Sequence, residues 1–280
     1  MHREDRQVNM HSERPALGLP RGQASESDID ASLRVEDSSG KAAGSFKRAY
    51  FITATDTDAG KTRITAGLAR ALRGSGVDVG VMKPVETGCK ESDGALVPAD
   101  AIALKKAASS VDPLDLINPY RFAPPLAPSI ASRMAGTEIS LSRIGECFQE
   151  IAGRHGVTLV EGAGGLLVPL TKDKTIADLI LYLGIPAIIV APSRLGAINH
   201  TALTVECAKK RGIDIKGIVL NNITPPSDDP SRKYNLDEIE RIAGVCVIAT
   251  MPFLEDEPAA KKNAPFPEEE GVFRTMIASL

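Results

Sequence analysis

A ten-residue stretch, TATDTDAGKT at residues 53–62, has the composition of a phosphate-binding loop. It follows the apolar run YFI and precedes RITAGLARALR, which predicts a helix. The backbone N–H groups of a strand-to-helix loop point at one spot, and the helix dipole favours an anion there. Gly60 allows close approach of the backbone, Lys61 reaches the outer phosphates and Thr62 places a hydroxyl on Mg²⁺. The alternative is a capped helix start in which Gly-Lys-Thr occurs by chance, and Thr55 stands where a standard Walker loop has its first glycine.

Three more charged residues follow apolar runs or begin a helix: Lys83 in MKPVETG, Asp100 in VPADAIAL and Glu161 in TLVEGAGG. A lysine at the end of a buried strand, on the rim that carries the phosphate loop, is placed to meet an anion, although a surface lysine is the usual alternative. A carboxylate that follows a buried strand is costly unless it is paired or binds a cation. With Thr62, the two carboxylates would make an oxygen-only site suited to Mg²⁺. Taken singly, Asp100 could instead cap a helix, and Glu161 a turn.

Two later strand ends carry groups that can bind other parts of a ligand. APSRLGAINH leads through Gly196 into a helix start, whose free backbone N–H groups can hold a carboxylate. LNNITPP ends a strand at Asn221 and Asn222, and an Asn side chain carries both a donor and an acceptor that can read a purine edge. A simple turn is the alternative for both asparagines. His155 and His200 lie on predicted helices and are interpreted as structural.

The elements that must position these residues alternate along the chain from Ala49 onward. Apolar runs predict strands at AYFITA, VDVGVMKPV, VTLVEGAGG, IPAIIVAPS, DIKGIVLNNI and VCVIATMPF, and the segments between them predict mainly helices. The runs are continuous rather than alternating, which indicates an α/β fold with a mostly parallel sheet wrapped by helices. The proline-rich segment NPYRFAPPLAPSIASRMAG predicts a loop that runs into a short helix.

Composition narrows the class of protein. The chain has 280 residues, of which 43% are hydrophobic and 25% charged, as in a soluble globular protein with a sizeable core. A net charge of −3 and an aromatic content of 4% argue against a nucleic-acid-binding surface. No apolar run reaches the roughly 18 residues of a membrane helix. The 4 cysteines form no CxxC pair, which favours reduced thiols in a cytosolic protein.

The two ends of the chain differ from its middle. Residues 1–48 are polar, mix both charges and show no period, so they predict a disordered tail without chemistry. A transit peptide is the weaker alternative, because such peptides avoid acids and this segment contains Glu4, Asp5 and Asp28. Residues 49–280 are predicted to form one domain. Its last part is first rich in proline and acids and then apolar, which predicts a surface segment and a short closing helix.

Taken in order, these segments resemble dethiobiotin synthetases over most of residues 50–254. The resemblance is carried by TDTDAGKT, MKPVETGC, ADAIAL, NPYRFAPPLAPSIAS, LVEGAGGLLVPL, RLGAINHTALT, GIVLNNITP and MPFL. It implies a P-loop NTPase-like, three-layer α/β/α fold and an ATP-dependent ligase of biotin biosynthesis that works in the cytoplasm as a homodimer. That family closes 7,8-diaminononanoate and CO₂ to dethiobiotin with MgATP, through a carbamate and a carbamic–phosphoric anhydride.

The resemblance also implies a role for each motif residue. Lys61 and Lys83 neutralise the charge that builds on the γ-phosphate and the carbamate, while Thr62, Asp100 and Glu161 hold Mg²⁺. The nucleotide contacts are Asp58, Ala59, Gly60, Lys61, Thr62, Asn221, Pro252, Phe253 and Leu254. The contacts to the diamine or carbamate are Thr57, Thr87, Gly164, Gly196 and Asn199, with Asp58 close to both ligands. The turn from Gly196 to His200 would bind the substrate tail near the dimer interface.

The phosphate loop departs from the family pattern, Gly-Thr-Asp-Thr-x-Val-Gly-Lys-Thr, at two positions. Ala54 replaces the first glycine and Ala59 the valine, and Asp58 stands where the family often has the longer Glu. If the first position needs a positive φ, alanine is strained there. We expect the loop still to bind phosphate, with altered affinity.

Three rival functions share parts of this pattern. A cobyrinate amide synthetase would need a glutaminase domain, for which the sequence after Asn221 leaves no room. A partition-type ATPase usually has a lysine just after the first glycine of its loop, where this chain has Thr55 and Asp56. A regulatory domain without catalysis would not need the charged and hydroxyl residues retained here, namely Lys61, Thr62, Lys83, Asp100 and Glu161.

Overall fold

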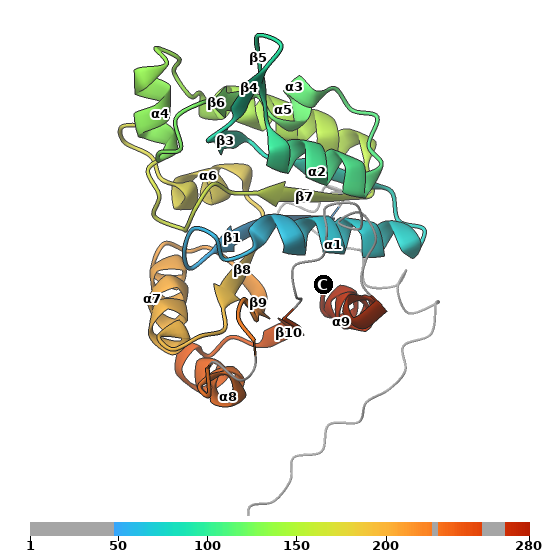
Figure 1. Ribbon diagram of the computed structural model, residues 1–280, viewed down its shortest axis with the longest axis vertical. Coiled ribbons are helices and arrows are strands. Elements are labelled where there is room, and N and C mark those ends of the chain that lie inside the picture. The colour runs from blue at the N-terminus through green and yellow to red at the C-terminus, as the bar shows by residue number, and fades with distance from the viewer. Residues whose placement is uncertain (1–47, 226–228, 254–266) are drawn as a thin grey trace, which may run out of the picture. The chain divides into compact units, whose positions relative to one another are not determined.

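A six-stranded parallel sheet is the centre of this computed structural model, which describes residues 48–225, 229–253 and 267–280 (Figure 1). In spatial order the strands are β10 (Val247–Met251), β9 (Ile215–Asn221), β8 (Ala187–Pro192), β1 (Arg48–Ala54), β7 (Val157–Glu161) and β2 (Val79–Met82). All residues of β2, β7 and β8 are buried. The continuous apolar runs of the sequence therefore correspond to strands covered on both faces.

Helices cover both faces of the sheet and make three layers. One face carries α1 (Lys61–Gly74), α2 (Ala99–Ala108) and α9 (Pro267–Ser279). The other carries α5 (Leu141–Arg154), α6 (Ile176–Leu183), α7 (Ala197–Lys210) and α8 (Arg232–Ala243). Alternate side chains of β1 enter the two cores: Ile52 packs with the α1 side and Phe51 with the α5 side. The expected three-layer α/β/α fold is confirmed.

The strand order places the phosphate loop at the middle of the sheet. β1 pairs with β7 on one side, where Ile52 is opposite Glu161, and with β8 on the other, where Ile52 is opposite Ile188. β7 also pairs with β2, so it separates the first two sheet strands of the chain. Because all six strands run in one direction, their carboxyl ends share one edge, and ligands bind at that edge in open α/β sheets.

Several short elements follow β2 along the chain, over residues 85–134. They are β3 (Val85–Thr87), β4 (Lys90–Ser92), β5 (Ala95–Val97), α3 (Leu114–Ile117), β6 (Tyr120–Phe122) and α4 (Pro128–Met134). β3 pairs in parallel with β6, and β4 forms an antiparallel hairpin with β5. The sequence predicted the short helix α4 but not α3. It predicted loops for β6 and most of β3 and no element for β4 and β5, because strands of three residues are too short to show a period.

Some sequence expectations fall outside the described residues. The tail expected over residues 1–48 lies outside them apart from Arg48, which begins β1. The described part of the closing segment is the helix α9. In the segments that the structure describes, no helix is long and apolar enough to cross a membrane.

Candidate active site

The loop from Thr55 to Gly60 turns sharply between β1 and α1. Gly60 has φ 90°, in the left-handed region that glycine tolerates best, and α1 begins at the next residue. A Cβ atom at Gly60 would lie 2.2 Å from Nδ2 of Asn221, so no larger residue can replace it without a shift. Asp58 also has a positive φ, of 57°. The Gly-Lys-Thr motif therefore opens a helix at a strand end, as the phosphate-loop interpretation requires.

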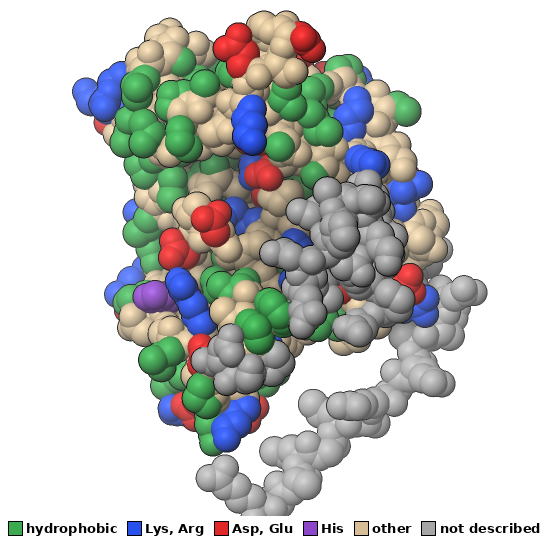
Figure 2. Space-filling model, viewed as in Figure 1, with side chains coloured by type: hydrophobic (Ala, Val, Ile, Leu, Met, Phe, Trp, Pro, Cys, Tyr) green, Lys and Arg blue, Asp and Glu red, His purple; other side chains and the backbone are tan. Residues whose placement is uncertain are grey.

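Most of the predicted site residues line one cavity of about 400 Å³ beside this loop. Figure 2 views a face on which acidic and basic side chains gather around a hollow. The cavity brings together residues predicted from four separate motifs: Thr57, Asp58, Gly60, Lys61, Thr62, Lys83, Thr87, Asp100, Glu161 and Gly164. Val85, Glu86 and Ala163 complete its lining.

Lys83 bridges the two acidic residues of the cavity. Its Nζ atom lies 2.5 Å from Oε1 of Glu161 and 2.9 Å from Oδ2 of Asp100. The Thr62 hydroxyl donates a hydrogen bond of 2.7 Å to the same Glu161 oxygen. Burial alone would lower the pKa of Lys83, but the charges and hydrogen bonds of Glu161 and Asp100 outweigh burial and raise it above the ordinary lysine value. Lys83 is therefore a fixed cation.

The pKa of Lys61 is shifted in the opposite direction to that of Lys83. Burial, and next the charge of Lys83, lower the pKa of Lys61, although Glu161, Asp100 and Asp58 act against this. Among the described residues, the Lys61 ammonium group forms no ion pair. A bound polyphosphate would supply a counter-charge, so Lys61 is suited to hold an anion in the cavity.

The cavity also offers oxygen ligands for a hard cation. Oε2 of Glu161 is buried and has no hydrogen-bond partner among the described residues, and Glu161 itself is 0% exposed. The Thr62 hydroxyl and the Asp100 carboxylate lie around the other Glu161 oxygen and Lys83. No cluster of three or more His, Cys, Asp or Glu side chains with metal-binding geometry occurs among the described residues. Mg²⁺ is usually bound by only one or two protein carboxylates together with phosphate oxygens of the substrate, so these residues fit that ion.

Glu86 is a buried carboxylate that sequence reasoning missed. Its two oxygens accept hydrogen bonds from the backbone N–H groups of Asp100 at 2.9 Å and Ala101 at 3.0 Å. α2 has Pro98 at its N-cap without a side-chain cap, so Glu86 caps this helix and the Asp100 side chain does not. Burial raises the pKa of Glu86, against the effect of the two backbone hydrogen bonds. Because the contact joins β3 to α2 across the β4–β5 hairpin, no local sequence signal marks it.

The predicted nucleotide-base contacts lie beyond the cavity, at the ends of β9 and β10. Asn221 is 2% exposed, and its Nδ2 donates to the Ala59 carbonyl at 2.9 Å. Its Oδ1 accepts from Nη1 of Arg63 at 3.2 Å, and Nη2 of Arg63 donates to the Pro252 carbonyl at 2.9 Å. Phe253 is half-buried, and Leu254 lies outside the described residues. Sequence reasoning missed Arg63, since an arginine in the first turn of a helix usually faces solvent.

Two predicted substrate residues do not line the cavity. Gly196 has φ 93° and precedes α7, and Asn199 is exposed on that helix. Arg194 and Asp56 form an exposed ion pair of 3.7 Å that links the α7 loop to the phosphate loop. A second cavity of about 430 Å³ lies between residues 55–57, 165–169 and the middle of α7. The roles of Gly196 and Asn199 stay predictions.

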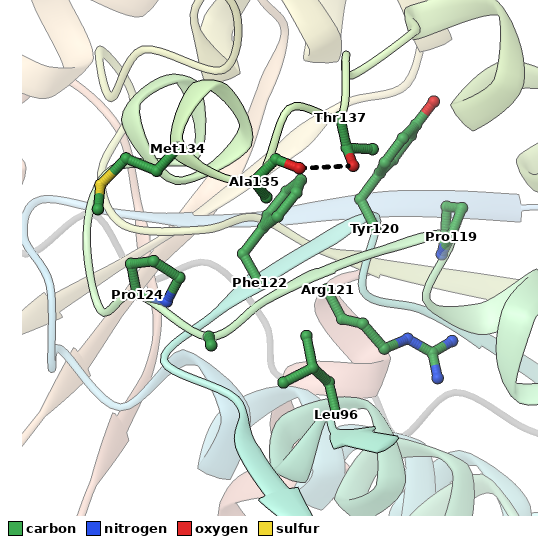
Figure 3. A pocket seen from close by; sticks show the side chains of 10 residues that line it. Leu96, Pro119, Tyr120, Arg121, Phe122, Pro124, Met134, Ala135 and Thr137 are labelled. Atoms are coloured by element: carbon green, nitrogen blue, oxygen red, sulfur yellow. Dashed lines mark hydrogen bonds between the residues drawn. The ribbon is translucent and has the colours of Figure 1, made fainter. Parts of the chain in front are cut away.

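A larger cavity of about 510 Å³ lies around β6 and the end of α4, and none of the predicted site residues lines it (Figure 3). Its lining is mostly apolar and contains one charged group, Arg121. That guanidinium is already paired with Asp115 at 2.6 Å and donates to the Asn118 carbonyl. In Figure 3 the Thr137 hydroxyl bonds to the Ala135 carbonyl. This cavity therefore lacks the convergent polar groups that the cavity beside the phosphate loop has.

Known structures with a similar fold include a cell division protein and a ParA family ATPase. The MinD cell division protein of Aquifex aeolicus superposes with a TM-score of 0.52 and 16% identity, over 82% of this chain and 96% of that one. A ParA family ATPase from Chlorobium tepidum TLS gives a TM-score of 0.51 and 16% identity, over 83% of this chain and 98% of that one. At such low identity the similarity shows the fold alone.

Sequence relatives are much closer. Residues 48–260 match the model of a family described as an AAA domain. The ATP-dependent dethiobiotin synthetase of Anaeromyxobacter dehalogenans (strain 2CP-C) is 47% identical over 209 residues, which cover 75% of this chain and 92% of the relative. The enzyme of the same name from Methanocaldococcus jannaschii is 37% identical over 74% of this chain and 94% of its own length. With this identity over nearly the whole length of its relatives, the chain belongs to the family of ATP-dependent dethiobiotin synthetases.

Proposed function

We propose that this protein closes the cyclic urea of dethiobiotin from 7,8-diaminononanoate, CO₂ and ATP, as an enzyme of biotin biosynthesis. Family membership supports the reaction, since the relatives are named as ATP-dependent dethiobiotin synthetases. The observation that carries the proposal in this chain is the Lys83 bridge, which holds a cation between Glu161 and Asp100 beside the Gly-Lys-Thr loop.

The proposed reaction has three steps, each with balanced atoms. One amine nitrogen of the diamine bonds to CO₂ and loses a proton, which gives a carbamate. A carbamate oxygen attacks the γ-phosphorus of ATP as the bond to ADP breaks, which gives a carbamic–phosphoric anhydride. The second amine attacks the carbamate carbon, loses a proton and expels inorganic phosphate, which closes the urea ring.

The residues of the cavity have matching tasks in this scheme. Phosphoryl transfer needs positioning and charge neutralisation more than covalent chemistry. Lys61, which forms no ion pair among the described residues, would bind the outer phosphates. Lys83 would hold the carbamate and γ-phosphate together against their mutual repulsion. Thr57, Thr87 and Gly164 line the part of the cavity where the diamine would lie.

Mg²⁺ belongs to this proposal as the partner of ATP. Thr62, Asp100 and Glu161 would hold it, and the unpartnered Glu161 oxygen supports that assignment. When bound, the ion would neutralise phosphate charge. The contacts of Asp58, Ala59, Asn221, Pro252 and Phe253 with the nucleotide, those of Gly196 and Asn199 with the substrate tail, the homodimer and the cytoplasmic location are further parts of the proposal.

The test is phosphate release from MgATP in bicarbonate buffer, with and without 7,8-diaminononanoate, together with the mass of the product. We expect phosphate release that depends on the diamine and a product with the mass of dethiobiotin. ATP hydrolysis at the same rate with and without the diamine would instead indicate a switch-type ATPase. An absence of hydrolysis would contradict the proposal and direct attention to Ala54 and Asp58 in the loop.

A further inference from the structure

The C-terminal helix α9 supplies a buried carboxylate to the nucleotide end of the site. Glu269 on α9 is 3% exposed, and its Oε1 atom accepts a hydrogen bond of 2.9 Å from Nε of Arg63. Nη2 of Arg63 lies 2.9 Å from the same oxygen. The match to the family model ends at residue 260, so this carboxylate comes from beyond the matched region. A carboxylate so deeply buried needs a cation, and Arg63 provides it.

The same guanidinium reaches two strand ends. Nη1 of Arg63 donates to Oδ1 of Asn221, the last residue of β9, at 3.2 Å. Nη2 donates at 2.9 Å to the carbonyl of Pro252, which follows β10. The planar fork of an arginine can serve several acceptors at once, which a lysine ammonium on a flexible stem does less well. Arg63 therefore joins α1 and α9 to the ends of β9 and β10.

Asn221 links Arg63 to the phosphate loop. Its Nδ2 donates to the Ala59 carbonyl and lies 2.2 Å from the place that a Cβ atom of Gly60 would occupy. The Ala59 carbonyl requires an N–H donor and Arg63 requires an oxygen acceptor, so together they fix which end of the amide points where. Without Arg63 the amide oxygen loses its donor, and the amide is free to turn away from the loop.

We propose that Arg63, held by Glu269, is a positioning residue for the bound nucleotide, and that α9 is thereby part of the nucleotide site. This inference rests on the proposed function in one respect, because it takes the phosphate loop and Asn221 as nucleotide contacts. Arg63 acts through Asn221 and Pro252, so its loss should weaken nucleotide binding and leave the affinity for the diamine unchanged.

The test compares two neighbouring acids on α9 in the full-length protein. Glu269→Gln removes the partner of Arg63, while Glu270→Gln is the matched control, since Glu270 is exposed and pairs only loosely with Arg274 at 3.9 Å. The dissociation constant of a non-hydrolysable ATP analogue is measured by calorimetry with Mg²⁺ present. We expect Glu269→Gln and Arg63→Gln each to weaken binding about tenfold, and the double variant to be no weaker than either, as for residues in one network. Glu270→Gln should bind like the wild type.

Arg63→Lys separates positioning from folding. It keeps a cation opposite Glu269, but one ammonium cannot reach Glu269, Asn221 and Pro252 together. We expect a melting temperature close to that of the wild type with nucleotide affinity still reduced. Equal affinities of the Glu269→Gln and Glu270→Gln variants would overturn the inference, and so would lowered melting temperatures with unchanged affinity. One outcome would overturn the proposed function and still support this inference. In that outcome the wild type binds nucleotide but makes no dethiobiotin, and the variants show the expected differences in nucleotide affinity.

Discussion

At the scale of single residues, the cavity depends on charges that hold one another in place. Lys83 is surrounded by carboxylates, and its charge is secured by them. Lys61 is buried next to another cation and lacks that security. One lysine thus serves as a fixed part of the site, while the other is completed by an anionic ligand. Replacement of Lys83 should therefore have different effects from replacement of Lys61.

Replacement of Lys83 by alanine should affect both catalysis and stability. It removes the cation that would hold carbamate and γ-phosphate together, so we expect diamine-dependent turnover to fall by about a hundredfold or more. It also leaves buried Glu161 without its counter-charge, which should lower the free energy of unfolding by about 3 kcal/mol. Phosphate release and urea unfolding measure the two effects. Unchanged turnover in folded Lys83→Ala would remove this residue from the mechanism.

Glu86 should fix the position of Asp100 through its hydrogen bonds to the backbone at the start of α2. Glu86→Gln replaces one accepting oxygen with an amide N–H₂ group that opposes a backbone N–H donor of α2. We expect a loss of about 1–2 kcal/mol in the free energy of unfolding, faster hydrogen exchange at Asp100 and Ala101, and turnover lowered about tenfold. Glu91→Gln on the exposed strand β4 is the control. If exchange at the start of α2 stays as slow as in this control, Glu86 does not position Asp100.

Sequence alone located the residues that stand directly at the ends of strands of the central sheet. Lys83, Glu161 and Asn221 follow or end continuous apolar runs, and parallel strands bring such ends to one edge of the sheet. Glu86 and Arg63 could not be found in this way. Their importance comes from contacts with residues far along the chain, at the start of α2 and on α9, and neither position differs locally from an ordinary surface residue.

At the scale of elements, the long strands and helices were predictable and the three-residue strands were not. Strands such as β8 and helices such as α5 have enough residues to show a period or a continuous run. β3 and β6 have three residues each and exist because they pair with one another. That pairing is a tertiary event, and it places Thr87 and Glu86 in the wall of the cavity.

The contact between α1 and α9 is close enough to exclude a methyl group. A Cβ atom at Gly67 would lie 2.0 Å from Cζ of Phe273, which is 1% exposed. We expect Gly67→Ala to lower the free energy of unfolding by about 2 kcal/mol, as is typical of overpacking. Gly74→Ala, at the end of the same helix, meets no atom within 4 Å and should be neutral or stabilising by up to about 1 kcal/mol. Denaturant unfolding of both variants provides the comparison, and equal stabilities would show that α9 can move aside.

At the scale of the whole molecule, a polar cluster lies at the amino-terminal ends of β2 and β7, at the edge of the sheet opposite the cavity. His155, which follows α5, contacts Asp78 at 2.9 Å and Asp112 at 2.8 Å. Asp112 is 2% exposed and also accepts from Arg154 at 2.8 Å and from the Ser110 hydroxyl at 2.9 Å. The position of His155 in this cluster therefore agrees with the structural role that the sequence predicted for it.

This cluster predicts part of the acid sensitivity of the fold. Burial alone would raise the pKa of Asp112, but hydrogen bonds from Arg154, His155 and Ser110 outweigh burial and hold it below the ordinary value of 3.8. A lowered folded pKa contributes stability that is present above pH 3.8 and is lost as the pH falls through the folded value. Asp112→Asn should be less stable at pH 7 and lose less stability on acidification. Urea unfolding across this range measures both curves, and parallel curves would contradict the prediction.

The strand order makes completion of the site a late event in folding. β1 carries the phosphate loop and β2 leads to Lys83, yet the strand between them is β7, and Arg48 pairs with Val157. Pairings so far apart along the chain are slow, because loop closure costs entropy before contacts repay it. During synthesis the loop emerges early, but β1 has no strand to pair with until β7 follows. A nascent chain that stops before Val157 therefore carries a complete phosphate-binding motif without the scaffold that would let it act.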